Sequence, residues 1–276
     1  MTPSLVVLTD FYAVPNRALS YAAGLAVPLH AQLVLLHVRH DNLLAPAEYG
    51  DSYHTWRGEQ KTAFALQQLA TDQPVPTEVD ISDDALPAAV REAVRHRHPL
   101  LLVLGRPDPL IAPEELVVGT AMNLLRRVPY PLLLVPGAGW DAFPPRRLLL
   151  LVDGQPFGLR PHQDLVRRLL QATGGTLGVV QVLTDGAATP DVAAVLGTVR
   201  ANDLVDAVGD ESLYQVYQPT VVDGALAEAS RQQADLLVVV ARPHGWLGGL
   251  LHDSVTARLL RASPIPVLVL PAEEEG

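Results

Sequence analysis

The chain has 276 residues, of which 49% are hydrophobic and 18% charged, and a formal net charge of −10. This length is enough for two domains of ordinary size, each with its own hydrophobic core. The negative charge argues against sequence-independent binding to nucleic acid or to an anionic membrane, since both depend on clustered lysine and arginine. Cysteine is absent, which excludes disulfides, thiolate catalysis and cysteine-ligated metal centres.

The N-terminal residues run directly into an apolar strand pattern and lack the basic segment of a secretory signal. The longest apolar runs, such as 148–152 and 236–241, are much shorter than a membrane span and fit buried strands. Together with the lack of cysteine, these features lead us to expect a cytoplasmic protein with neither a membrane nor a nucleic acid as its partner.

In the first half of the chain, apolar runs alternate with segments of helical periodicity. We expect strands near residues 4–9, 32–38, 76–81, 100–104 and 132–136, and helices near 16–27, 59–71, 85–97 and 120–128. Strands that are apolar throughout are buried on both faces, as parallel strands between helices are.

The second half has the same alternation. We expect strands near residues 147–152, 176–183, 212–218, 236–240 and 266–270, and helices near 161–173, 191–206, 221–234 and 254–262. The segment between the halves is rich in glycine and proline, as linkers are. These features predict one domain over residues 1–136, a linker over 137–145 and a second domain over 146–276.

Three segments of the first half recur in the second half, in the same order. An apolar strand that ends in Asp10 recurs as one that ends in Asp153, 100–107 recurs as 236–243, and 124–136 recurs as 259–271. The chain is therefore a duplication. Alternating strands and helices with right-handed crossovers predict, for each copy, an α/β fold with a doubly wound, five-stranded parallel sheet. Ligands of such sheets bind beyond the carboxyl ends of the strands, where the strand order reverses.

Each copy resembles the universal stress protein family, and the resemblance covers nearly the whole chain. It is carried by Asp10 after the first strand, Gly105 at the end of the fourth, Gly119-Thr120 opening a helix, and the Val128-Pro-Tyr-Pro131 segment before the fifth. The resemblance implies a Rossmann-like fold of the adenine-nucleotide α-hydrolase type and a role in the stress response. Nucleotide-binding members carry Gly-x2-Gly-x9-Gly-Ser/Thr, whose backbone N–H groups and hydroxyl hold the phosphates.

The resemblance implies that ATP or a related adenine nucleotide, together with magnesium, binds the first copy through Asp10, Gly105, Gly119 and Thr120. The corresponding residues of the second copy are Asp153 and Ser254. Both copies depart from the motif, because Asp108 stands at the second glycine, Ala241 at the first glycine of the second copy, and Asp253 before Ser254. Carboxylates near phosphates oppose binding, and added Cβ atoms crowd the loop. We therefore expect a weakened first site and a degenerate second site.

Each candidate also has a purely structural interpretation. Asp10 and Asp153 could cap turns, and Gly105 could serve only as a turn residue. Gly119-Thr120 and Asp253-Ser254 are good helix N-caps without any ligand. Arg106 and Arg242 could reach an anion, although a solvated surface arginine is the simpler interpretation. His96 and His98 fit a solvated helix better than half of a metal site.

The sequence contains neither a P-loop nor a Gly-x-Ser-x-Gly elbow. We assign no catalytic residue and no metal ligand. If the protein has any enzymatic activity, we therefore expect at most weak nucleotide hydrolysis. Two functions fit these features best. The first is a nucleotide-responsive regulatory protein, and the second is a non-enzymatic interaction or scaffold module that has lost nucleotide binding. Family members commonly dimerise through their fifth strand. The resemblance therefore implies an internal pseudo-dimer through 132–135 and 267–270, and leaves room for further homo-oligomerisation.

Overall fold

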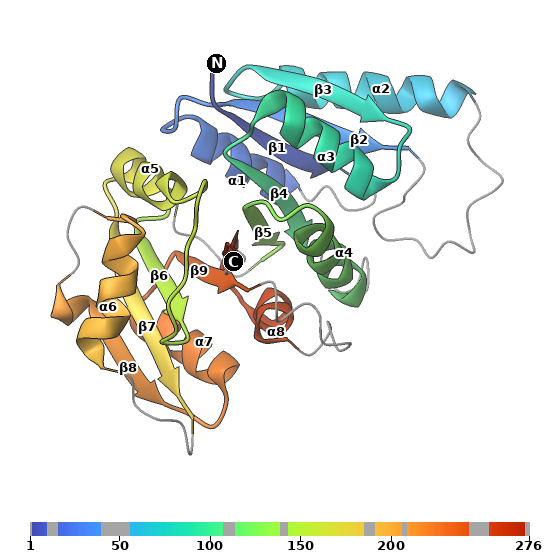
Figure 1. Cartoon of the computed structure of the whole chain (residues 1–276). Coiled ribbons are helices and arrows are strands. Elements are labelled where there is room, and N and C mark those ends of the chain that lie inside the picture. Colours follow the sequence, from blue (N-terminus) through green and yellow to red (C-terminus); the bar gives the residue numbers. More distant parts are fainter. Residues whose placement is uncertain are drawn as a thin grey trace. The chain divides into compact units, whose positions relative to one another are not determined.

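The computed structural model describes residues 2–9, 16–39, 56–106, 114–138, 143–184, 191–205, 209–242 and 254–273 (Figure 1). In the first copy, strands and helices alternate from end to end. The elements are β1 (Ser4–Thr9), α1 (Asn16–Ala26), β2 (Gln32–Val38), α2 (Trp56–Thr71), β3 (Thr77–Ser82), α3 (Leu86–Arg97), β4 (Leu101–Arg106), α4 (Glu114–Arg127) and β5 (Leu132–Pro136).

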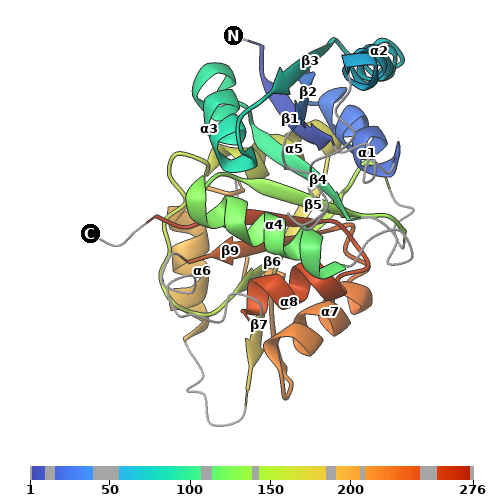
Figure 2. The ribbon, with the colours of Figure 1, turned by 90° about the vertical axis from the view of Figure 1, so that its right-hand side faces the viewer.

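The strand order of the first copy is β3-β2-β1-β4-β5. β1 pairs in parallel with β2 and with β4, and β2 pairs in parallel with β3. Helices α1 and α2 lie on one side of these strands and α3 lies on the other, where it packs against α4 (Figure 2). This is the doubly wound arrangement that the alternation of elements predicts.

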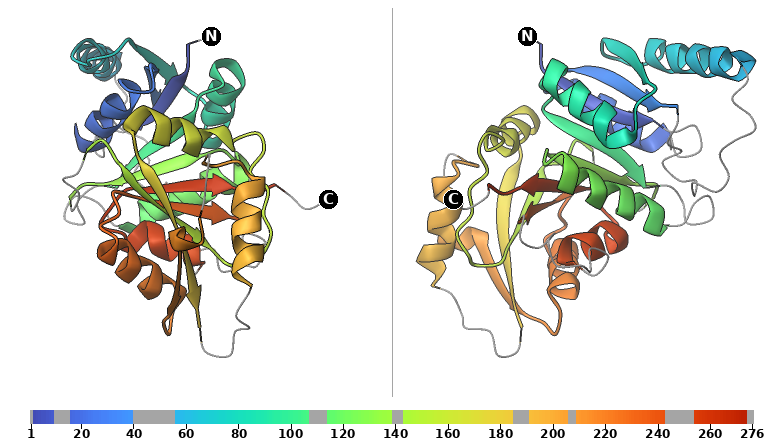
Figure 3. Two further views of the ribbon diagram at one scale, coloured as in Figure 1. Left: turned by 90° about the vertical axis from the view of Figure 1, so that its left-hand side faces the viewer. Right: turned by 45° about the vertical axis from the view of Figure 1, so that its right-hand side comes forward.

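The second copy repeats this plan. Its elements are β6 (Arg147–Val152), α5 (Asp164–Thr173), β7 (Thr176–Leu183), α6 (Val192–Ala201), β8 (Leu213–Tyr217), α7 (Val221–Arg231), β9 (Leu236–Ala241), α8 (Val255–Ala262) and β10 (Val267–Pro271). The strand order is β8-β7-β6-β9-β10, and the neighbouring pairs are parallel. Figure 3 shows α7 and α8 on one side of these strands and α6 on the other. The α/β fold class is therefore confirmed in both copies.

Burial of apolar side chains explains why these segments become strands and helices. Every residue of β1 is buried, as is every residue of β5 and β10. Helix α5 presents Leu165, Val166, Leu169 and Leu170 to the core from one face, at the spacing of a helical repeat. Each fully buried Leu or Val contributes about 1.5–3 kcal/mol. No helix in the described part of the chain is long and apolar enough to cross a membrane.

The largest difference from the sequence prediction is the start of α4. The helix was expected to open near Thr120, but it begins at Glu114. Proline followed by two glutamates, as in Pro113-Glu114-Glu115, favours the first turn of a helix because proline lacks the N–H that would be unpaired there and carboxylates stabilise the positive end of the helix dipole. Gly119 and Thr120 therefore lie inside the helix.

Candidate functional site at the carboxyl ends of the strands

The strand order reverses between β1 and β4 in the first copy and between β6 and β9 in the second. The crevice at such a point is where doubly wound sheets bind their ligands. In the first copy, Gly105 is buried in β4. The predicted residue Asp10, like Asp108, lies outside the described residues. In the second copy, the described residues include the loop after β6 and, after β9, Arg242.

A polar anchor fixes the point where the first copy's chain leaves β1. Thr9 and His37 are register partners at the ends of β1 and β2, and both are buried. His37 Nδ1 lies 3.1 Å from the Thr9 carbonyl oxygen, and the Thr9 hydroxyl donates a hydrogen bond to the Leu36 carbonyl at 3.2 Å. These contacts hold the residue that precedes Asp10. The sequence signal was a polar residue at the end of each of two apolar strands.

Gly119 and Thr120 do not open a helix, and that prediction is wrong. They lie beyond the first turn of α4, where the Thr120 hydroxyl donates a hydrogen bond to the Leu116 carbonyl at 2.9 Å. This bond to the preceding turn is the usual one for a threonine inside a helix. A phosphate held by helical N–H groups would instead face the first turn at Glu114, which is followed by the exposed Glu115.

In the second copy, Asp153 and Arg242 pair at the point where the strand order reverses, between the ends of β6 and β9. Arg242 follows β9, and its Nε and Nη2 donate to the two oxygens of the Asp153 carboxylate at 2.8 and 3.0 Å. The same guanidinium donates to the carbonyl oxygens of Gln155 and Pro156 at 3.0 and 2.8 Å. Arg242 therefore ties the loop after β6 to the end of β9. It is not the solvated surface arginine that the sequence favoured.

Two further residues hold the same loop. Asn202 is buried at the end of α6; its oxygen accepts a hydrogen bond from the Leu159 N–H at 2.9 Å, and its amide group donates to the Phe157 carbonyl at 2.8 Å. The Glu273 N–H donates to the Gly158 carbonyl at 2.8 Å. The segment from Asp153 to Leu159 is thus fixed along its length by contacts from three other parts of the second copy.

These contacts define what Asp153 can do. One of its oxygens also accepts a hydrogen bond from the Gln155 N–H at 3.0 Å, so that the residue closes a turn, as one of the two sequence interpretations held. Both carboxylate oxygens are occupied by groups of the protein. A ligand that contacts Asp153 has to displace Arg242 or share the carboxylate with it.

Ser254 is the N-cap of α8. Its backbone is extended, and its hydroxyl accepts a hydrogen bond from the Ala257 N–H at 3.1 Å. The capping interpretation therefore holds for this residue, whereas its contact with a phosphate stays a prediction. Asp253, which precedes it, lies outside the described residues.

His96, near the end of α3, is paired with an acidic side chain of its own helix. His96 Nε2 lies 2.6 Å from a carboxylate oxygen of Glu92, one helical turn earlier, and both side chains are more than half exposed. Within the described ranges, no group of three or more histidine and acidic side chains is placed to hold a metal ion. The exposure of His96 and Glu92 places this pair on a solvated face of α3.

We expect Arg242→Ala to loosen the loop after β6. Because four hydrogen bonds are lost at a partly exposed site, the free energy of unfolding should fall by only about 1–2 kcal/mol. Hydrogen exchange of the Gln155 and Leu159 amides should become about tenfold faster. Arg168→Ala is the control, since Arg168 makes only a 3.5 Å pair with Asp164 on an exposed helix face. Unchanged exchange at both amides would show that Arg242 does not hold the loop.

The strand order and parallel pairing of the two copies define a tandem, doubly wound α/β protein. The sequence model of the universal stress protein family matches residues 1–136 and again residues 145–271. The chain therefore belongs to the universal stress protein family and contains its domain twice. A search of curated protein sequences returns no match.

Solved structures support the fold. A universal stress protein from Archaeoglobus fulgidus DSM 4304 is similar over 99% of this chain and 97% of its own, with 14% identity and a TM-score of 0.66. A protein of unknown function from Pseudomonas aeruginosa PAO1 is similar over 98% of this chain and 93% of its own, with 18% identity and a TM-score of 0.61. At such low identity, these likenesses establish the tandem architecture and leave the ligand open.

Proposed function

We propose that this chain is a non-enzymatic regulatory protein of the stress response, in which an adenine nucleotide binds the first copy and the second copy is closed to nucleotides. The observation that carries this proposal is the pairing of Arg242 with Asp153. In the second copy, the carboxylate that would receive the adenosine end of a nucleotide is already bound by an internal cation. Ala241 at the first glycine position and Asp253 before Ser254 add to the asymmetry.

In the first copy, the residues fit the adenosine end of a nucleotide better than its phosphates. Asp10 follows β1 directly in the sequence, and Thr9 with His37 fixes the exit from β1. Gly105, the last residue but one of β4, has no Cβ atom. Glu115 in the first turn of α4 and Asp108 in the preceding loop would repel a polyphosphate. We therefore expect ATP with magnesium to bind no more tightly than AMP.

A second candidate is an interaction module that binds no nucleotide in either copy. The observation that favours it is the position of Gly119 and Thr120 inside α4, which removes the N-terminal geometry of the family's phosphate site from this pair. Such a module would act through its surfaces and would keep the two sheets as a scaffold.

Calorimetric titration of the full chain separates these candidates. With AMP, and with ATP and magnesium, we expect one nucleotide per chain, lost in Asp10→Asn and retained in Asp153→Asn. Asp72→Asn, at an exposed position after α2, is the control for loss of one carboxylate. Two nucleotides per chain, or loss of binding in Asp153→Asn, would overturn the assignment to the first copy. No binding of any adenine nucleotide would favour the interaction module.

We also propose that the domains are residues 1–136 and 146–276, joined by 137–145, and that β5 and β10 form an internal interface in the manner of a family dimer. Each of these strands is the last in the order of its own copy and contains no charged residue. An uncharged strand at the end of a sheet needs a partner or a cover to avoid aggregation. The duplication supplies such a partner within the chain.

A further inference from the structure

A pocket of about 710 Å³ lies in the second copy, at the amino ends of its strands. Among the residues that line it, Arg147 begins β6, Thr176 begins β7 and Asp235 directly precedes β9. Because the strands are parallel, this end of the sheet is opposite to the carboxyl ends, where Asp153 pairs with Arg242. The pocket is therefore separate from the site described above, and its volume is that of a small-molecule site.

The walls of this pocket are accessible to a ligand. Gly174, between α5 and β7, has a φ of 62°, and no atom from elsewhere in the described chain lies within 4 Å of the position that a Cβ would take. The Phe143 side chain, which also lines the pocket, is 39% exposed, and Arg146 is exposed as well. A ligand can therefore contact both side chains without any rearrangement of the buried core.

The backbone of Arg146 is held on both sides. Its N–H donates a hydrogen bond to the Asp235 carboxylate at 2.9 Å, and its carbonyl accepts one from the Thr176 N–H at 2.7 Å. Its side chain, in contrast, forms neither a hydrogen bond nor an ion pair with any described residue. An arginine on a fixed backbone has less freedom to lose when it binds an anion.

The charges of the pocket leave one positive charge unmatched. The Asp235 side chain is 5% exposed, and its oxygens accept hydrogen bonds from the N–H groups of Arg146 and Arg147 at 2.9 Å. The Arg147 guanidinium lies 3.3 Å from the same carboxylate and donates to Gln233 at 2.9 Å. Two guanidinium groups therefore stand against one buried carboxylate that is already fully bonded. The excess positive charge is on Arg146.

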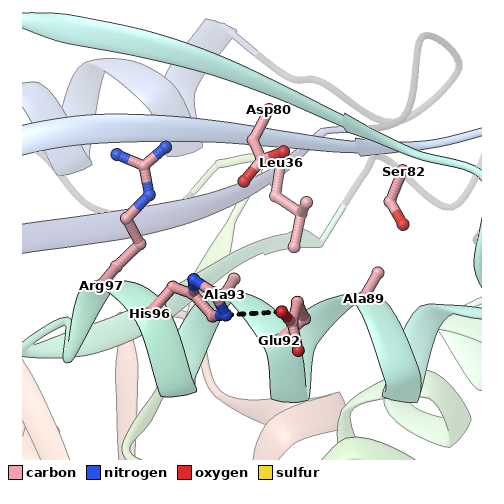
Figure 4. A pocket seen from close by; sticks show the side chains of 8 residues that line it. All are labelled: Leu36, Asp80, Ser82, Ala89, Glu92, Ala93, His96 and Arg97. Atoms are coloured by element: carbon pink, nitrogen blue, oxygen red, sulfur yellow. Dashed lines mark ion pairs between the residues drawn. The ribbon is translucent and has the colours of Figure 1, made fainter.

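A smaller pocket of the first copy lacks such an excess. It has a volume of about 180 Å³ and lies between α3 and the strands β2 and β3 (Figure 4). Its wall has acidic side chains, Asp80 and Glu92, together with basic ones, His96 and Arg97. Neither sign of ligand charge is favoured there, whereas the pocket of the second copy favours an anion.

We propose that the pocket at the amino ends of β6 and β7 binds a small organic monocarboxylate. The planar guanidinium of Arg146 pairs with the carboxylate through two parallel hydrogen bonds, and the apolar body of the ligand lies against the exposed part of the Phe143 ring. A monoanion balances the excess charge of the pocket. A phosphate monoester, with about two negative charges, would leave one unmatched beside the Asp235 carboxylate. The site does not depend on nucleotide binding.

Titration of the full chain with sodium benzoate, followed by amide NMR, tests this proposal. We expect saturable shifts of the Gly174 and Thr176 amide signals, which sodium chloride at equal concentration does not produce. Benzyl alcohol, which lacks the charge, and phenyl phosphate, which has more than the pocket can balance, should both bind at least about tenfold more weakly. Arg146→Gln should weaken benzoate binding by a similar factor. Arg258→Gln, which removes an exposed arginine of α8, should leave it unchanged.

Four outcomes would overturn the proposal. These are equal binding of benzyl alcohol and benzoate, equal binding of phenyl phosphate and benzoate, equal benzoate binding by Arg146→Gln and the parent, and absence of saturable shifts at Gly174 and Thr176. Arg146→Gln should fold normally, since the side chain is exposed and the backbone contacts with Asp235 and Thr176 remain. Because Asp10 is unchanged in both variants, nucleotide titrations on the same samples report separately on the proposed function.

Discussion

Replacement of Asp235 by alanine should lower the free energy of unfolding by about 3 kcal/mol, because it removes three hydrogen bonds to a buried carboxylate. The Asp235 side chain, directly before β9, is 5% exposed. One oxygen accepts hydrogen bonds from the backbone N–H groups of Arg146 and Arg147, both at 2.9 Å, and the other lies 3.3 Å from the Arg147 guanidinium. Without the carboxylate, two N–H groups at the start of β6 lose their partner. Urea denaturation followed by circular dichroism measures the loss.

Asp210→Ala is the matched control. Asp210 forms a 3.5 Å pair with Arg200, and both side chains are about half exposed or more. Its replacement should change the free energy of unfolding by less than about 0.5 kcal/mol. Asp235→Asn keeps one oxygen acceptor, so its loss of free energy of unfolding should lie between those of Asp210→Ala and Asp235→Ala. If Asp235→Ala were as stable as Asp210→Ala, the start of β6 would not depend on this carboxylate.

A charge in the fifth strand of either copy should prevent normal folding. Leu133 is 1% exposed and Leu268 is 0% exposed. An aspartate at either position places an unpaired carboxylate among apolar side chains, which costs more than about 4 kcal/mol. We expect Leu133→Asp and Leu268→Asp to separate the copies or to precipitate, as judged by soluble yield and gel filtration. Val27→Asp, at a position that is 50% exposed, should remain soluble and compact. Parent-like stability of both strand variants would exclude these strands as an interface.

Cysteine pairs test the proposed interface more directly, because the chain has no cysteine of its own. Three double variants each carry cysteine in place of Leu134 and in place of one of Leu268, Val269 and Leu270. Under mild oxidation, we expect a disulfide to form in at least one of the three. Val180 in β7 is the control, since β7 is three strands away from β10 in the second copy's order and would be out of reach of a disulfide. Cross-linking to Val180 as readily as to β10, or no cross-link to any of the three, would contradict the proposal.

Much of this fold follows from local features of the sequence. Strand positions could be predicted because parallel strands buried on both faces are continuous apolar runs, and the duplication because matching segments recur in order. The start of α4 was also encoded locally, in Pro113-Glu114-Glu115, but the family motif led to Thr120 instead. Ser254 was correctly placed at a helix N-cap, since capping depends on residues only a few positions apart.

The state of the candidate sites was decided by the tertiary structure. Asp153 was predicted at the end of a strand, yet its partner Arg242 lies 89 residues further along the chain. The two meet only because the strand order places β6 beside β9. The pocket that Asp80, His96 and Arg97 line is a comparable case, since its lining depends on which residues α3 turns toward β3 when the helix packs on the sheet (Figure 4). Sequence periodicity determines which face of an element is buried, but which charges face each other across two elements depends on strand order, register and helix packing.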